Sequence, residues 1–335
     1  MIQKLKSVIK EKHHLSWYIG IVGFLVVMIA AVIMILSASK QIDYVWQWNR
    51  VPARFFTHKV VKSDTKGEIK KITIEGSAAI IEVENADGIE IFQVKEKNLL
   101  LKRGDFVSPG TILAESNSFK PGILIEGLGL TLLISLYSSI FGIIIGLFGG
   151  LARVSKNPGL KGLVIIYVEL IRGSPLMVQI LIWYFVIGTL VNDNLSMMGL
   201  SIISPVGWGV ISLSIFAGAY VTEIVRGGIE SVPKGQMEAA RSSGMSYLQA
   251  MIYIILPQAL KVALPALTGQ FISLIKDSSL LGIIAIRELT KASREIVAST
   301  MMTFEFFLIL AVLYLILTFP LSMFVKYLEQ KAKVK

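Results

Sequence analysis

The sequence predicts an all-α polytopic membrane protein of about six transmembrane helices, with a small β-rich domain inserted on the extracytoplasmic side. Hydrophobic residues make up 54% of the 335 residues and charged residues only 17%, and the mean hydropathy is +0.68. Such values are unusual for a soluble domain. Six segments are also long and apolar enough to cross about 30 Å of hydrocarbon. They lie near residues 17–37, 123–151, 162–188, 204–226, 261–286 and 304–325.

The first apolar segment is predicted to be a retained N-terminal membrane anchor. It begins at Trp17 and Tyr18 and follows a basic tail, so residues 1–37 form a cytoplasmic tail and an anchor. The small residues Ser37, Ala38 and Ser39 also fit a cleaved signal peptide. We favour the anchor because the apolar run is longer than a usual signal core.

Residues 38–120 differ in kind from the apolar segments, because they carry charges of both signs. Two short runs, IKKITIEG (69–76) and AAIIEVEN (78–85), are typical of β-strands. Pro109-Gly110 suits a type II turn between two further strands. This region is therefore predicted to be the extracytoplasmic β-rich insert.

The positions of lysine and arginine predict the sidedness of the chain. With six spans, the N-terminal tail, the loops after the second and fourth spans, and the basic C-terminal tail (330–335) all lie on one side. The positive-inside rule makes that side, and both termini, cytoplasmic. The basic residues concerned are Lys4, Lys6, Lys10, Lys12, Arg153, Lys156, Lys161, Arg226, Lys234 and Arg241, followed by the KAKVK tail.

Composition excludes several classes of function. The chain has no cysteine, which excludes disulfides and thiolate metal sites, and its three histidines suggest no metal site. No G-x-x-x-x-G-K-[ST] pattern occurs, so the chain lacks that kind of ATP-binding loop. The net charge of +10 is explained by the cytoplasmic loops rather than by nucleic-acid binding. We therefore predict a non-enzymatic chain that needs a separate energy source.

The cytoplasmic stretch after the fourth span predicts two short helices. Pro233 suits a helix start, and Gly244 suits the position just after a helix end. Ser246 and Gln249 have the spacing of a capping box that begins a second helix. Pro257 should break or kink this second helix before the next span.

The first of these helices has features of a docking surface. Small side chains at Ala239 and Ala240 would allow another backbone to come close. Glu238 and Arg241 can pair with each other or meet charges of a partner. An ordinary loop helix on the lipid surface is the alternative.

The pattern Glu-Ala-Ala, three residues, Gly, nine residues, Ile, one residue, Leu-Pro resembles the coupling motif of permease subunits of binding-protein-dependent ABC importers. The resemblance implies that this loop contacts a partner ATPase subunit and transmits its movement. The residues assigned to ATPase coupling are Glu238, Ala239, Ala240, Arg241, Gly244, Ile254, Leu256 and Pro257.

The resemblance extends from about Gly127 to Glu329 and is closest to the polar amino-acid subfamily, whose substrates include glutamine, glutamate, histidine and arginine. Segments such as YVELIRGSPLMVQILIWYF and FISLIKDSSLLGIIAI contribute to it. It implies a type I ABC importer core of five helices over residues 121–329, with coupling helices around 231–257, in a bacterial inner membrane. Import, rather than export, rests on this resemblance.

The implied partners are ABC ATPase subunits, a second permease chain that is a copy or a relative, and an extracytoplasmic amino-acid-binding protein. ATP and Mg would be bound by the ATPase subunit, and no cofactor by this chain. The β-rich insert departs from the subfamily's compact plan. It is either a module that binds or stabilises the amino-acid-binding protein, or an insert without a transport role.

Polar residues inside predicted spans are candidates for a substrate pathway, because such residues are costly in a bilayer. Glu169 and Arg172 can pair, and Gly173, Ser174 and Pro175 should interrupt their helix. A purely structural Glu–Arg pair is the alternative.

The fifth span adds further polar residues. Asp277 could meet the ammonium group of an amino acid unless Lys276 neutralises it. The full set of pathway candidates is Glu169, Arg172, Ser174, Gln179, Gln270, Ser273, Asp277 and Ser278.

Two other functions fit the residues. In the first, the β-rich domain senses a ligand and the cytoplasmic helix recruits an effector. In the second, the chain is an ion-coupled secondary transporter that uses Asp277 and Glu169.

Overall fold

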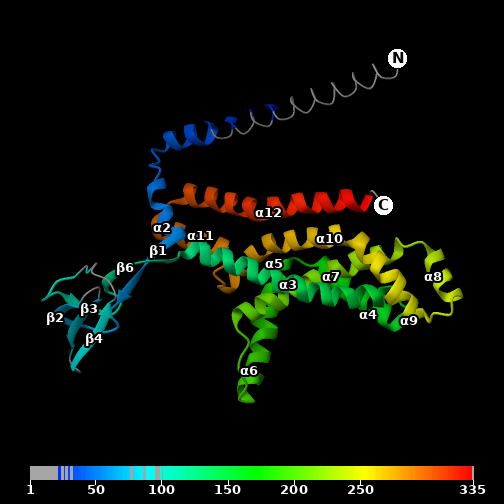
Figure 1. Cartoon of the computed structure of the whole chain (residues 1–335), viewed down its shortest axis with the longest axis horizontal. Coiled ribbons are helices and arrows are strands. Elements are labelled where there is room, and N and C mark those ends of the chain that lie inside the picture. The colour runs from blue at the N-terminus through cyan, green and yellow to red at the C-terminus, as the bar shows by residue number, and fades with distance from the viewer. Residues whose placement is uncertain are drawn as a thin grey trace. The chain divides into compact units, whose positions relative to one another are not determined.

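The structure is a computed structural model that describes residues 22–23, 26, 29–30, 33–75, 78–85, 88–94, 99 and 101–333. The chain divides into two units, Met1–Trp48 and Asn49–Lys335 (Figure 1). In the first unit the described residues up to Gln41 are helical. Part of the predicted anchor, including Trp17 and Tyr18, lies outside the described residues.

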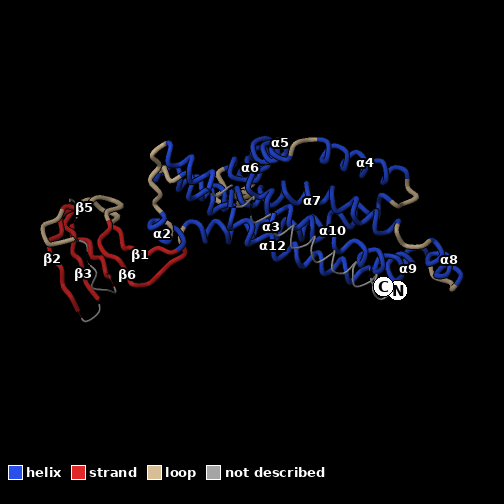
Figure 2. The backbone as a smooth tube through the Cα atoms, turned by 90° about the horizontal axis from the view of Figure 1, so that it is seen from above, coloured by secondary structure: helices blue, strands red, loops and turns tan. Residues whose placement is uncertain are grey.

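The second unit begins with short helical turns and six strands, which form the β region (Figure 2). The elements are η1 (Trp48–Arg50), α2 (Pro52–Phe55), β1 (Phe56–Lys62), β2 (Gly67–Glu75), β3 (Ala78–Asn85), β4 (Gly88–Val94), β5 (Phe106–Val107) and β6 (Ile112–Pro121). β1 pairs with β6, and the other four strands form an antiparallel sheet in the order β4-β3-β2-β5.

Alternation along β3 explains why this sequence forms a sheet. Ala79, Ile81 and Val83 are buried in the core of the β region, whereas the residues between them are more exposed. The predicted turn at Pro109-Gly110 is confirmed. Gly110 has φ +92°, and the Thr111 N–H donates to the Ser108 carbonyl at 2.9 Å.

The remainder of the second unit is helical, and five of its helical stretches are long and apolar enough to cross a membrane. These stretches are Ile123–Arg153, Leu176–Met197, Pro205–Glu230, Tyr247–Ile284 and Thr303–Tyr327. The elements are α3 (Ile123–Arg153), α4 (Pro158–Gly173), α5 (Leu176–Leu181), η2 (Ile182–Gly188), α6 (Thr189–Met197), α7 (Pro205–Glu230), α8 (Lys234–Ser242), α9 (Tyr247–Ala250), η3 (Met251–Ile255), α10 (Leu256–Asp277), η4 (Ser278–Ile284), α11 (Leu289–Thr300) and α12 (Thr303–Lys333).

α3 and α7 approach each other along a seam of glycines. A methyl group added at Gly146 would lie 2.3 Å from Cγ1 of Val221, and one added at Gly142 would lie 2.7 Å from Cβ of Ala217. Gly150 follows Gly146 by a further four residues, and a methyl group added there would meet Val225. Small residues at this spacing let membrane helices pack closely, and this pair forms the centre of the helical core.

The predicted span 162–188 is corrected by the structure. The chain breaks after Gly173, as expected, because Pro175 forces Ser174 into an extended conformation (φ −118°, ψ 148°). The helical stretch of membrane length then runs from Leu176 to Met197. It includes the π-helical η2.

Of the two alternatives predicted for Pro257, a break or a kink, the structure excludes the break. The helical stretch is continuous from Tyr247 to Ile284, so the second cytoplasmic helix and the fifth span are one element. The π-helical winding of η3 precedes the proline, and the Leu256 N–H donates to the carbonyl of Met251 five residues earlier. Pro257 then occupies the first turn of α10, where its missing N–H is tolerated.

Candidate functional site

The coupling loop, residues 231–257, has one face against the chain's own helices. Ala240 is buried at 7% exposure, and Met251 and Ile255 lie in a core cluster with residues of α7. Met237 and Ile254 pack against this cluster and are partly buried. The loop is therefore seated on the end of α7 by apolar contacts.

Gly244 ends α8 with a complete Schellman motif. The Met245 N–H donates to the Ala240 carbonyl at 3.2 Å, and the Gly244 N–H donates to the Arg241 carbonyl at 3.1 Å. Gly244 has φ +86°, a conformation that favours glycine. Nothing lies within 4 Å of a methyl group added there, so backbone conformation, not space, requires the glycine.

The second helix begins with the predicted capping box, which is confirmed. The Gln249 N–H donates to Oγ of Ser246 at 3.2 Å, and the Ser246 N–H donates to Oε1 of Gln249 at 2.8 Å. Nε2 of Gln258 also donates to the Ile254 carbonyl at 2.8 Å. Local hydrogen bonds thus fix the corner between α8 and α9.

The outward face of the loop presents the rest of the predicted coupling residues. Glu238, Ala239, Arg241, Gly244 and Pro257 are exposed. Leu256 is half-buried.

One expectation for this face is wrong. Ala240 faces the chain's own core, so of the two alanines Ala239 alone is exposed to a partner. Among the described residues, Glu238 and Arg241 do not pair with each other, which leaves the alternative that they meet charges of a partner. Arg241 instead donates to the Met245 carbonyl at 2.7 Å.

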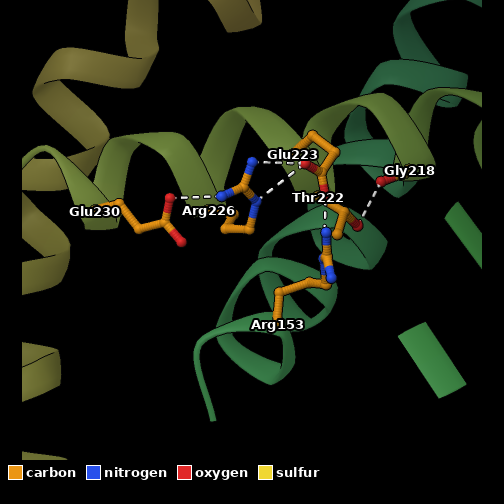
Figure 3. A network of polar contacts seen from close by, with 6 residues as sticks. All are labelled: Arg153, Gly218, Thr222, Glu223, Arg226 and Glu230. Carbon is orange, nitrogen blue, oxygen red and sulfur yellow. Dashed lines mark hydrogen bonds and ion pairs between the residues drawn. The ribbon is translucent and has the colours of Figure 1, made fainter. Parts of the chain in front are cut away.

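A network of charged residues lies where α3 and α7 lead toward this loop (Figure 3). Glu223 of α7 accepts hydrogen bonds from Nε of Arg153 at 3.0 Å and Nε of Arg226 at 3.0 Å. Arg226 also pairs with Glu230. Sequence analysis missed this network, although the spacing of Glu223, Arg226 and Glu230 on one helix face was a usable signal.

The break between α4 and α5 is closed by two of the predicted pathway residues. Nε2 of Gln179 donates to the Ile171 carbonyl at 2.7 Å and to the carbonyl and Oγ of Ser174 at 3.1 and 2.8 Å. Gln179 is 5% exposed. Its amide therefore satisfies carbonyl groups that the helix break leaves free.

The expected pairing of Glu169 with Arg172 does not occur among the described residues. The Arg172 guanidinium lies over the ring of Tyr220, 5.3 Å from its centroid, which is a cation–π contact. Both Glu169 and Arg172 are exposed on this chain. Gln179 lies on a different helix from Glu169 and Arg172, because α4 ends at Gly173 and α5 begins at Leu176.

Asp277 lies at the end of α10, where the winding changes to the 3-10 helix η4. Within the described part of the chain, the side chains of Gln270, Ser273 and Asp277 make no hydrogen bond. Ser278 is buried, and its Oγ donates to the Ile275 carbonyl at 2.8 Å. α4, which carries Glu169 and Arg172, packs on α3 and α7. α5, which carries Gln179, packs against η4, the turn that begins at Ser278 directly after Asp277.

Glu288 is a buried carboxylate that sequence analysis missed. It accepts hydrogen bonds from the N–H groups of Thr290 and Lys291, both at 2.7 Å, and so caps α11. Tyr314 of α12 donates to it at 3.4 Å. Burial raises the pKa of Glu288 above 4.5, against the lowering effect of its donors.

Comparison with known proteins identifies the helical core. Residues 138–334 match the family described as the binding-protein-dependent transport system inner membrane component. The probable glutamine ABC transporter permease protein GlnM of Bacillus subtilis (strain 168) is 39% identical over 62% of this chain and 91% of its own length. The glutamine transport system permease protein GlnP of Escherichia coli (strain K12) is 37% identical over 63% of this chain and 94% of its own length.

A solved structure agrees with these relatives. A chain from the crystal structure of an amino acid ABC transporter with histidines is 37% identical, with a TM-score of 0.54, over 62% of this chain and 94% of that chain. This structural match covers the permease fold. The coupling loop, residues 231–257, carries the motif expected of a permease subunit. The chain therefore belongs to the family of binding-protein-dependent transport system inner membrane components, the membrane-spanning permease subunits of ABC importers.

Proposed function

We propose that the chain carries a polar amino acid of the glutamine, glutamate, histidine or arginine class into the cell, driven by a partner ATPase. The observation that carries this proposal is the coupling loop, whose exposed Glu238, Ala239 and Arg241 lie on a corner fixed by Gly244 and Ser246. The names of the glutamine permease relatives support the substrate class.

The proposed complex has three further kinds of subunit. ABC ATPase subunits bind ATP and Mg, hydrolyse the ATP, and contact the coupling loop. A second permease chain, a copy or a relative, completes the membrane part. An extracytoplasmic amino-acid-binding protein delivers the substrate. Nucleotide states of the ATPase that bind the inward- and outward-facing forms differently would then drive alternating access.

In this proposal Asp277, Gln270 and Ser273 line the substrate pathway. Their side chains make no hydrogen bond among the described residues, so they are available to an ammonium or amide group. The described contacts of Gln179, Ser174 and Ser278 are internal to the chain, which favours a structural role for these three.

The test is ATP hydrolysis by the complete complex in lipid vesicles, with each polar amino acid added in turn. One amino acid should stimulate hydrolysis, and Gly244→Asp should reduce that stimulation at least about tenfold, equivalent to 1.4 kcal/mol of coupling. Gly244→Asn should retain it, because asparagine tolerates positive φ without adding charge. Gly110→Asp makes the same change at a positive-φ turn of the β region and should have no effect.

Two results would contradict the proposal. One is a well-folded complete complex whose hydrolysis ignores every amino acid and the Gly244→Asp change, which would favour the sensor function. The other is uptake that continues after ATP depletion while an ion gradient is maintained, which would favour a secondary transporter.

A further inference from the structure

A cavity of about 400 Å³ lies at the end of α3 that is remote from the coupling loop, where β6 leads into the helix. Its volume is in the usual range for small-molecule sites. Its walls come from the base of the β1–β6 pair and from the ends of α3 and α11. The polar residues lining it include Arg54, Thr57, Lys120, Glu126, Arg287 and Glu295.

Backbone contacts join the base of the β1–β6 pair to the start of α3. The Gly122 N–H, just before α3, donates to the Phe55 carbonyl at 2.7 Å. A methyl group added at Gly122 would lie 2.5 Å from the Arg54 carbonyl oxygen, so only glycine allows this approach. Thr57 pairs with Lys120 in the β1–β6 register. The backbone at Arg54 and Lys120 is therefore held beside the first turn of α3.

The charges in the cavity are only partly matched by the chain itself. Arg287 pairs with Glu295 at 2.7 Å. Within the described residues, Arg54, Lys120 and Glu126 form no ion pair. The hydroxyl of Thr57 is shielded from solvent and has no hydrogen-bond partner in the described part of the chain. Two cations and one carboxylate thus remain for a ligand.

We infer that this cavity binds an acidic α-amino acid such as glutamate. Its two carboxylates match Arg54 and Lys120, its ammonium matches Glu126, and its net negative charge complements the cavity's surplus of one positive charge. This site is separate from the transport proposal. Arg54, Lys120 and Glu126 lie before the family match, which begins at residue 138, whereas Arg287 and Glu295 lie within it. The cavity lies away from the coupling loop.

The test is calorimetric titration of the full chain in phosphatidylcholine nanodiscs with L-glutamate. Saturable binding is expected, and Arg54→Gln or Lys120→Gln should each raise Kd at least about tenfold, the effect of losing one charge-assisted contact. Glu126→Gln should weaken binding of glutamate but not of glutarate, which lacks the ammonium. Arg103→Gln, an exposed change outside the cavity, should leave Kd unchanged.

Three results would overturn the inference. They are no saturable binding of glutamate, an unchanged Kd in the Arg54→Gln/Lys120→Gln double variant, and binding of glycerophosphoethanolamine alone, which would indicate a lipid-headgroup site. Asp277→Asn should leave this Kd unchanged. If Asp277→Asn abolished glutamate binding, glutamate would be bound in the transport pathway, and the inference of a separate site would be overturned. Because the titration needs no ATPase, its outcome is independent of the ATP-hydrolysis experiment.

Discussion

Gln179 and Glu288 illustrate how this chain uses buried polar side chains. Gln179 satisfies the carbonyls left free by the helix break, and Glu288 satisfies two N–H groups that begin α11. An unsatisfied backbone group inside a bilayer or core costs several kcal/mol, roughly 2–7 depending on the surroundings. These side chains therefore allow irregular backbone where a continuous helix would otherwise be required.

The raised pKa of Glu288 predicts a pH dependence of stability. The folded chain keeps a proton on Glu288 at pH values where the unfolded chain has lost it, because burial disfavours the charged form. The free energy of unfolding should therefore fall as the pH rises from 4.5 through the raised pKa. Glu288→Gln should remove this part of the dependence, measured as Tm against pH in detergent.

An exposed glutamate provides the control for that measurement. Glu90→Gln in β4 should leave the slope of Tm against pH as it is in the wild type. Equal slopes for the wild type and Glu288→Gln would show that the titration of Glu288 does not contribute to stability.

At the scale of elements, the close contact between α3 and α7 depends on glycines, which have no side chain. Gly142, Gly146 and Gly150 lie on one face of α3, and each would meet an atom of α7 if it carried a methyl group. In a membrane, helices gain little from hydrophobic burial and associate through such close packing. The Arg153–Glu223 bridge adds a polar contact at the end of the same pair.

Gly146→Ala should therefore destabilise the chain by about 1–3 kcal/mol, the usual cost of overpacking, measured by thermal unfolding in detergent. Gly129→Ala is the matched control on the same helix, since nothing lies within 4 Å of a methyl group there. It should be neutral or stabilising. Equal Tm values for Gly146→Ala and Gly129→Ala would show that these glycines do not set the distance between α3 and α7.

At the scale of the whole chain, we propose that both termini and the coupling loop face the cytoplasm and that the β region faces outward. Basic residues at the ends of α3 and α7 and in α8 support this orientation through the positive-inside rule.

The absence of native cysteine makes this orientation easy to test. Single cysteines at two exposed positions, Ser108→Cys in the β region and Ser242→Cys in α8, would be treated with a membrane-impermeant maleimide on spheroplasts. Ser108→Cys should react at once, and Ser242→Cys only after permeabilisation. The cysteine-free parent gives the background, and the reverse pattern would invert the topology.

Local patterns in the sequence predicted the features that depend on neighbouring residues. Gly244 as a helix stop and the Ser246–Gln249 capping box are confirmed because each rests on contacts within a few positions. The β3 alternation and the Pro109-Gly110 turn are confirmed for the same reason.

Features set by distant contacts could not be predicted in this way. Pro257 indicated a break, but the π-helical winding before it lets the helix continue. Ala240 looked available to a partner, yet it lies against the chain's own helices. Arg172 was expected to pair along its own helix, but its guanidinium lies over the ring of Tyr220 of α7.

The corner between α8 and α9 is held by hydrogen bonds within the chain itself. Such a preorganised surface loses little conformational entropy when it binds. In the proposed complex, the ATPase would therefore bind a preformed surface rather than a segment that must first become ordered. Force applied to the corner would pass through the continuous helix from Tyr247 to Ile284, which ends just beyond Asp277.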